Sequence, residues 1–151
     1  IRHRLPAGVT PLELQLQWRV SSRKEHVGSE ALRRRRERGA AARSTAVASR
    51  EPLHAGDTVT LSNRSVGELL AASYSPVRED WIGLALIERP LAHAGARGFE
   101  ALRDGERAPL CALAPPLLNN RSLYVDPRQD TYRERYDRTL PPLVLPRQRC
   151  L

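Results

Sequence analysis

Arginine side chains form the densest group of chemically capable residues in this chain. Arg33, Arg34, Arg35, Arg36 and Arg38 fall within six consecutive positions. A guanidinium presents a planar fork of donors that fits phosphate and carboxylate oxygens, and several together contact a phosphate backbone without reading its sequence. The cluster therefore predicts binding to a polyanion, favouring RNA. A solvated helix face is the alternative interpretation.

A second group of arginines alternates with tyrosines toward the C-terminus. Tyr132 and Tyr136 are examples of these tyrosines. The arginines that we assign to RNA binding are Arg128, Arg133 and Arg135. Aromatic rings interleaved with arginine can stack on bases along a single strand. The alternative is that the tyrosines dock this tail on the chain's own body or on a neighbouring protein.

Catalytic and metal-binding patterns are missing from the sequence. The four histidines do not share ligand spacing, and the two cysteines are too distant to form a Cys-x-x-Cys pair. Neither a Gly-x-Ser-x-Gly elbow nor a phosphate-binding glycine loop occurs. We therefore expect no catalytic residue, no metal and no cofactor. No apolar run approaches the roughly 18 to 20 residues that span a bilayer, so no membrane span is expected.

Charge and composition narrow the class of partner. The formal net charge is +8, and 24 of the 25 basic residues are arginine because Lys24 is the only lysine. A GC-rich genome would explain the choice of arginine over lysine, but not the sign of the net charge. The length of 151 residues suits one domain. Position 1 is Ile rather than Met, so we expect a removed targeting segment or an upstream domain.

The spacing of apolar and turn residues predicts the elements that would carry these arginines. Alternation over 12–18 predicts a half-buried strand, and 25–38 predicts a basic helix ended by Gly39. Short strands are predicted over 43–49, 57–61, 66–73, 81–88, 98–102 and 108–113, with 81–88 buried. The fold class expected is mainly β with one basic helix, built as a small antiparallel β-barrel. We divide the chain into an N-terminal module with the basic helix (1–42), the barrel (43–113) and a Pro/Arg/Tyr-rich extended arm (114–151).

Four segments resemble a known family in their order and spacing. They are Leu-Pro-Ala-Gly-Val-Thr-Pro-Leu-Glu at 5–13, Leu-His-Ala-Gly-Asp-Thr-Val at 53–59, Val-Gly-Glu-Leu-Leu at 66–70 and Trp-Ile-Gly-Leu-Ala-Leu-Ile at 81–87. Together they resemble the C-terminal part of the folate-binding superfamily. This superfamily includes the glycine-cleavage T-protein, the YgfZ-type proteins and their mitochondrial relative in iron–sulfur cluster assembly. The resemblance covers roughly residues 5–113. It implies that 1–42 is a remnant of the family's central folate-binding module, followed by an aminomethyltransferase-like C-terminal barrel, of which 53–59 would be the first strand.

Residues 23–30 resemble a degenerate form of the YgfZ signature Lys-Gly-Cys-aromatic-x-Gly-Gln-Glu. Gly28 and Glu30 match it, Arg23 replaces the lysine, Glu25 stands in place of the cysteine and Ser29 in place of the glutamine. A carboxylate cannot replace a thiol as a nucleophile or as a soft metal ligand. The departure at Glu25 therefore implies a relic enzyme fold reused for binding, with no small-molecule substrate.

The function expected from these features is structural. We expect a non-catalytic component of a mitochondrial ribonucleoprotein, most concretely the mitochondrial ribosome in the matrix, with rRNA and neighbouring proteins as partners. Two alternatives remain open: a folate-linked iron–sulfur cluster maturation factor, and an accessory subunit of a respiratory complex.

Overall fold

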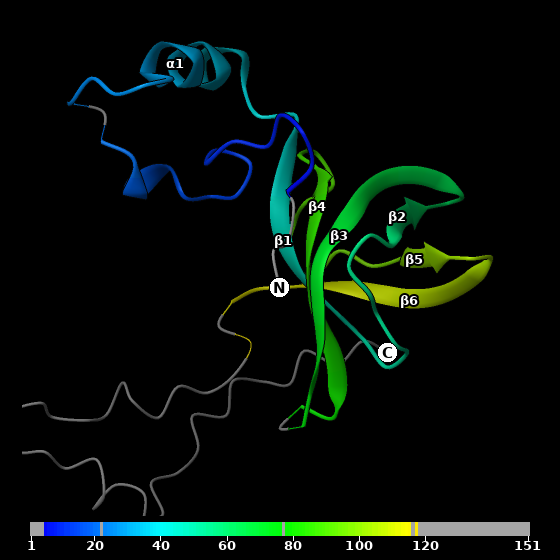
Figure 1. The fold of residues 1–151 in the computed structure, drawn as a ribbon. Helices are drawn as coiled ribbons and strands as arrows, with labels where there is room; N and C mark the ends of the chain where they lie inside the picture. Colours follow the sequence, from blue (N-terminus) through cyan, green and yellow to red (C-terminus); the bar gives the residue numbers. More distant parts are fainter. Residues whose placement is uncertain (1–4, 22, 77, 116, 118–151) are drawn as a thin grey trace, which may run out of the picture.

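A computed structural model describes residues 5–21, 23–76, 78–115 and 117 of the chain. Residues 5–41 form an N-terminal unit that contains the short 3-10 helix η1 (Gln17–Arg19) and the helix α1 (Ser29–Arg38). This unit lies at one end of a β-barrel, beside the start of the first strand (Figure 1). In the described part of the chain, no helix is long and apolar enough to cross a membrane.

Six strands close into the barrel. They are β1 (Ala42–Ser49), β2 (Thr58–Leu61), β3 (Arg64–Ser75), β4 (Asp80–Glu88), β5 (Phe99–Arg103) and β6 (Glu106–Leu113). Their spatial order is β1-β4-β3-β2-β5-β6, and each neighbouring pair is antiparallel. Closure leaves no strand edge without a partner. The fold class predicted from the sequence, mainly β with a small antiparallel barrel, is confirmed.

The long strand β3 bends to close the barrel. Its pairing with β2 shifts register between Val59 and Thr60, and its pairing with β4 shifts between Leu69 and Ala71. Such irregularities bend a strand and increase its twist, which a small barrel requires. Gly67 lies in the bent region, where a Cβ atom would come within 2.2 Å of the Leu86 carbonyl oxygen. The backbones of β3 and β4 therefore approach too closely for any other residue at this position.

Two of the connections follow directly from local sequence. The β2–β3 hairpin turns through Ser62 and Asn63, whose φ angles are 50° and 63°. The β5–β6 hairpin turns through Asp104 and Gly105, at 49° and 90°. Asn, Asp and Gly tolerate this left-handed region, and two such residues in succession suit a tight hairpin. Both turns lie between strands that the sequence predicted, the first between 57–61 and 66–73 and the second between 98–102 and 108–113.

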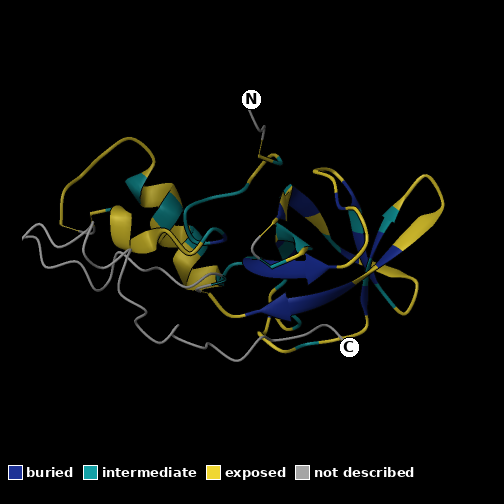
Figure 2. Ribbon diagram, turned by 90° about the horizontal axis from the view of Figure 1, so that it is seen from below, coloured by how far each residue is buried: buried dark blue, intermediate teal, exposed yellow. Residues whose placement is uncertain are grey.

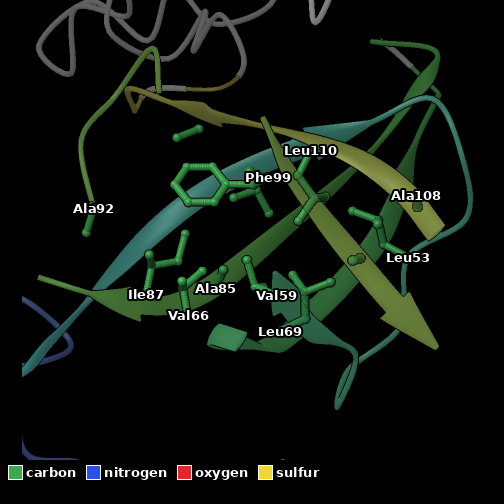
Figure 3. Close-up of a cluster of buried hydrophobic side chains, with 13 residues drawn as sticks. Leu53, Val59, Val66, Leu69, Ala85, Ile87, Ala92, Phe99, Ala108 and Leu110 are labelled. Atoms are coloured by element: carbon green, nitrogen blue, oxygen red, sulfur yellow. The ribbon is translucent and has the colours of Figure 1, made fainter. Parts of the chain in front are cut away.

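The barrel interior is filled mainly by aliphatic side chains. Val47, Val59, Leu69 and Ile87 are fully buried, and the single phenylalanine, Phe99, packs with them (Figure 3). All residues from 44 to 49 on β1 are buried, because a second cluster packs on the outer face of this strand. The members of that cluster are Ala46, Ala48, Cys111 and Leu113, with Ile82 and Leu117 against them. Side chains of β6 thus pack beside those of β1 on this outer face, and Leu117 packs against them.

Four expectations from the sequence were wrong in whole or in part. Residues 12–18 form turns and η1 rather than a strand, and Leu16 and Trp18 are exposed. The strand β4 alternates between the interior and solvent instead of being buried throughout, with Leu84 exposed. The first barrel strand is β1, and 53–59 is mostly the connection that leads into β2. Helix α1 begins at residue 29 rather than 25, and it ends before Gly39 as predicted.

Candidate functional site

Helix α1 presents the arginine cluster, and the residues at its two ends explain where it forms. Gly28 precedes it with φ of 87°, a left-handed conformation, and its carbonyl oxygen accepts from the Leu32 amide at 2.9 Å. Gly39 ends it with φ of 81°. Glu30 occupies the first turn and arginines the last turn, which matches the helix dipole at both ends. Figure 2 shows that α1 is mostly exposed, in contrast to the buried strand segments of the barrel, which are dark blue.

Helix α1 buries no residue of its own, so polar contacts must hold it in place. The central contact is Glu13, whose side chain is only 2% exposed. Glu13 Oε1 accepts a hydrogen bond from Arg35 Nε of α1 at 2.8 Å, and Arg35 Nη2 lies 2.8 Å from the same oxygen in an ion pair. Its Oε2 accepts from the Thr10 amide at 2.9 Å and from the Thr10 hydroxyl. One carboxylate therefore joins the helix to the turn at residues 10–13.

The same turn is fixed to the barrel by its backbone and a neighbouring side chain. The Ser44 amide of β1 donates to the Glu13 carbonyl oxygen at 2.7 Å, and Gln15 Nε2 donates to the Ser44 carbonyl oxygen at 2.7 Å. The connection from barrel to helix thus runs from Ser44 through Glu13 to Arg35. We call these three residues, with Thr10 and Gln15, the Glu13 anchor.

The charge of Glu13 is favoured by this environment. Burial by itself raises the pKa of a carboxyl group, but the hydrogen bonds from Thr10 and Arg35 outweigh it, and the net pKa of Glu13 is lowered. Glu13 is therefore ionised at neutral pH and forms a charge-assisted pair with Arg35.

The five helix arginines divide into two groups. Arg35 is held by Glu13, and Arg34 pairs with Glu30 one turn earlier. Arg33, Arg36 and Arg38 are exposed, and none of them forms an ion pair with another described residue. These three guanidinium groups thus have no carboxylate partner among the described residues, although Arg38 Nε donates to the Arg34 carbonyl oxygen at 3.4 Å, and they are available to an external anion. We call Arg33, Arg36 and Arg38 the free arginines of α1.

Positive charge is unevenly distributed between the N-terminal unit and the barrel. Residues 5–41 contain eight basic and four acidic side chains, whereas residues 42–113 contain eight basic and nine acidic ones. Several barrel arginines are also neutralised locally, including Arg64 by Glu88, Arg103 by Asp57 and Arg107 by Glu100. The barrel is therefore close to neutral, and the excess positive charge of the described residues belongs to the N-terminal unit.

The degenerate signature residues surround the start of α1. Arg23 and Glu25 are exposed in the preceding loop, Gly28 provides the left-handed turn, and Ser29 and Glu30 begin the helix. Glu30 is engaged with Arg34. Among the described residues, no group of three His, Cys, Asp or Glu side chains is placed to hold a metal ion. Arg128, Arg133 and Arg135, with their neighbouring tyrosines, lie outside the described residues.

Sequence reasoning missed the residue that positions the helix. Thr10-Pro11-Leu12-Glu13 is a capping-box pattern, in which a Thr and a Glu three positions later satisfy each other's backbone groups, with Pro favoured just after the Thr. The structure has this arrangement, since Glu13 accepts from the Thr10 amide and Thr10 Oγ1 accepts from the Leu12 amide. The pattern was a signal for a turn at this place. Nothing in the sequence indicated that Glu13 also contacts Arg35.

Comparison with known proteins identifies the type of barrel. No family model matches the chain. The aminomethyltransferase T of the glycine cleavage system from Bartonella henselae has a similar structure, with a TM-score of 0.64 and 16% identity over 72% of this chain and 32% of that one. The barrel is therefore of the aminomethyltransferase C-terminal type.

Sequence comparison shows a relationship to the aminomethyltransferases. The chain is 31% identical over 83 residues to the aminomethyltransferase of Thermosipho melanesiensis, which covers 54% of this chain and 23% of that protein. The chain is thus homologous to the aminomethyltransferases, and its resemblance to the folate-binding T-protein superfamily is confirmed over this C-terminal region. It spans about a quarter of the length of this curated relative.

Proposed function

We propose that this chain acts by binding rather than by catalysis, as a structural or assembly component of a mitochondrial ribonucleoprotein in the matrix. The mitochondrial ribosome is the most concrete candidate, with rRNA and neighbouring proteins as partners. The observation that carries this proposal is the separation of charge. The barrel is nearly neutral, whereas the N-terminal unit at its end has twice as many basic as acidic side chains.

The anchored helix suits contact with a phosphate backbone. The Glu13 anchor fixes the orientation of α1, so the free arginines of α1 are presented without a further ordering step. Contacts between arginine and phosphate are independent of sequence and release counterions, which makes them sensitive to salt. A large assembly would also cover the exposed surface of the N-terminal unit. Its four exposed large apolar side chains are Leu5, Leu16, Trp18 and Val27.

The signature region supports a role without chemistry. Glu25 is exposed and stands where the YgfZ signature has cysteine, and a carboxylate lacks the nucleophilicity and soft-metal affinity of a thiolate. The inference of a non-enzymatic role rests on this substitution.

A second candidate is a folate-linked role in iron–sulfur cluster maturation. It is favoured by the 31% identity to an aminomethyltransferase and by Gly28, which keeps the glycine of the signature at the left-handed turn before α1. In this case residues beyond the matched region would supply the folate pocket.

Sedimentation of native extracts separates these proposals. At moderate salt the tagged full-length chain is expected to migrate with ribosomal RNA and to shift to light fractions after ribonuclease treatment. Free migration before ribonuclease treatment would exclude the ribonucleoprotein role. Stoichiometric binding of tetrahydrofolate in equilibrium dialysis would favour the second candidate. Migration with detergent-solubilised respiratory complexes, unchanged by ribonuclease, would instead favour an accessory respiratory subunit.

A further inference from the structure

The indole of Trp18 is an exposed aromatic surface in the N-terminal unit. Its side chain is 70% exposed, although tryptophan usually buries most of its surface in a core or an interface. The guanidinium carbon of Arg19 lies over the ring, 4.3 Å from its centroid. This cation–π contact covers part of the indole, and the high exposure leaves a large part of the ring open to a planar partner.

The chain around Trp18 is positively charged and lacks acidic residues. Residues 14–24 contain Arg19, Arg23 and Lys24 and no Asp or Glu. The Ser21 hydroxyl oxygen accepts from the amides of Arg23 and Lys24, both at 3.2 Å, which holds these two residues close to Ser21. Both of these basic residues are exposed. The open aromatic ring is therefore followed within six positions by two cations.

We infer that Trp18 stacks on an unpaired base of a single-stranded nucleic acid, while Arg19, Arg23 and Lys24 contact the adjoining phosphates. This inference rests on the proposed function and specifies its ligand. An aromatic platform beside cations is the arrangement by which proteins hold single strands, because every base has a π face and every nucleotide a phosphate. Duplex RNA does not satisfy it, since its bases are stacked on each other and its deep groove excludes side chains.

Intrinsic fluorescence offers a direct test, because the chain has two tryptophans. In a Trp81→Phe variant, Trp18 is the only tryptophan. The full chain would be titrated with an oligouridylate of about 12 nucleotides, within the length that one such site covers, and with a duplex RNA and inorganic polyphosphate of similar charge. We expect the oligouridylate to quench Trp18 strongly, and the duplex and polyphosphate to bind with little quenching.

A second test measures binding affinity in variants that keep Trp81, so its result does not depend on how the Trp81→Phe variant folds. Trp18→Ala is expected to weaken oligouridylate binding about 5- to 150-fold, with polyphosphate binding unchanged, and Trp18→Phe to retain part of the affinity. Tyr74→Ala is the matched control. Tyr74 is also an exposed aromatic, at 49%, but it lies on the barrel with its ring against Trp81, and its loss is expected to leave binding unchanged.

The outcomes distinguish this inference from the proposed function. Oligouridylate binding that does not depend on Trp18, or equal quenching by polyphosphate, overturns the stacking site alone. Quenching by phosphatidylglycerol vesicles with no response to RNA also overturns it and assigns the surface to a lipid. Stacking on oligouridylate without migration with ribosomal RNA in extracts retains the site and removes the ribosomal role. If the chain binds no RNA at all, both the stacking site at Trp18 and the proposed ribonucleoprotein role are excluded.

Discussion

Glu13 and Arg35 lie 22 positions apart in the sequence and form the contact that attaches helix α1 to the rest of the chain. The Glu13 side chain is almost fully buried, whereas the Arg35 side chain is one-third exposed. Arg35 therefore fixes the position of the helix, and the free arginines of α1 remain available to bind a ligand. A cluster that is uniform in sequence thus contains residues with different roles.

Glu13→Gln is expected to loosen α1 without unfolding the barrel. The amide keeps the shape of the side chain but loses the charge that pairs with Arg35, and removing one partner of a mostly buried pair costs about 1–3 kcal/mol. Hydrogen exchange of the α1 amides should accelerate correspondingly, about 5- to 150-fold, while exchange in β1 to β6 stays slow.

Glu30→Gln provides the control for this change. It breaks the pair with Arg34, whose partners are both well exposed, and such pairs contribute about 0.3–0.5 kcal/mol. Exchange in α1 should change less than about threefold. Equal effects of the two substitutions would mean that Glu13 does not anchor the helix.

Acid should release α1 in the same way. The folded-state pKa of Glu13 is lowered, so its stabilising contribution is complete above the unfolded pKa of about 4.3 and is lost as pH falls through the folded value. Protection of the α1 amides, corrected for intrinsic exchange rates, should be constant near neutrality and decrease below about pH 4. The Glu13→Gln variant should lack this dependence, and an unchanged acid transition in the variant would assign it to another group.

Gly67 should tolerate no other residue. Most glycines of the described residues adopt a positive φ, whereas Gly67 is required because the β4 backbone leaves no space for a Cβ atom. A Cβ at this position would lie 2.2 Å from the Leu86 carbonyl oxygen, which belongs to the β4 backbone and cannot move without breaking the β3–β4 pairing. Gly67→Asn is expected to cost more than about 3 kcal/mol in urea unfolding or to prevent folding.

Gly95→Asn is the comparison for that substitution. Gly95 has φ of 82°, and a Cβ there would have no neighbour within 4 Å. Asparagine tolerates the left-handed region, so this variant should stay within about 1 kcal/mol of the wild type. Similar losses at both positions would show that the barrel does not have the close backbone approach described here.

Local signals in the sequence were sufficient for much of the barrel. The turns at Asn63 and at Asp104-Gly105 require residues that accept positive φ, and the alternating apolar residues on either side then fix the hairpins. The end of α1 at Gly39 followed from the same chemistry. These features depend on neighbouring residues only, which explains why they could be read in order along the chain.

Contacts between distant segments could not be predicted in this way. Alternation at Leu12, Leu14 and Leu16 indicated a strand, but the capping interaction between Thr10 and Glu13 favours a turn instead. The pairing of β1 with both β4 and β6 closes the barrel, and it depends on bulges that leave no clear pattern in the sequence. The choice of Arg35 rather than another arginine as the partner of Glu13 is likewise set by how the helix lies on the turn.

The free arginines of α1 should contribute to the salt dependence of RNA binding. Replacing Arg33 and Arg36 together by Gln removes two phosphate contacts, so the slope of log K against log salt should fall by about 1.4 for a single strand. Replacing Arg50 and Arg97 by Gln removes the same charge from exposed positions on the barrel side of the molecule. This matched variant should leave the slope nearly unchanged, because non-contacting charges release few counterions. Filter-binding titrations between 50 and 200 mM salt would measure both slopes, a range over which such contacts change affinity strongly. An equal decrease in the two variants would indicate a diffuse attraction by net charge and would remove α1 as the phosphate-binding element.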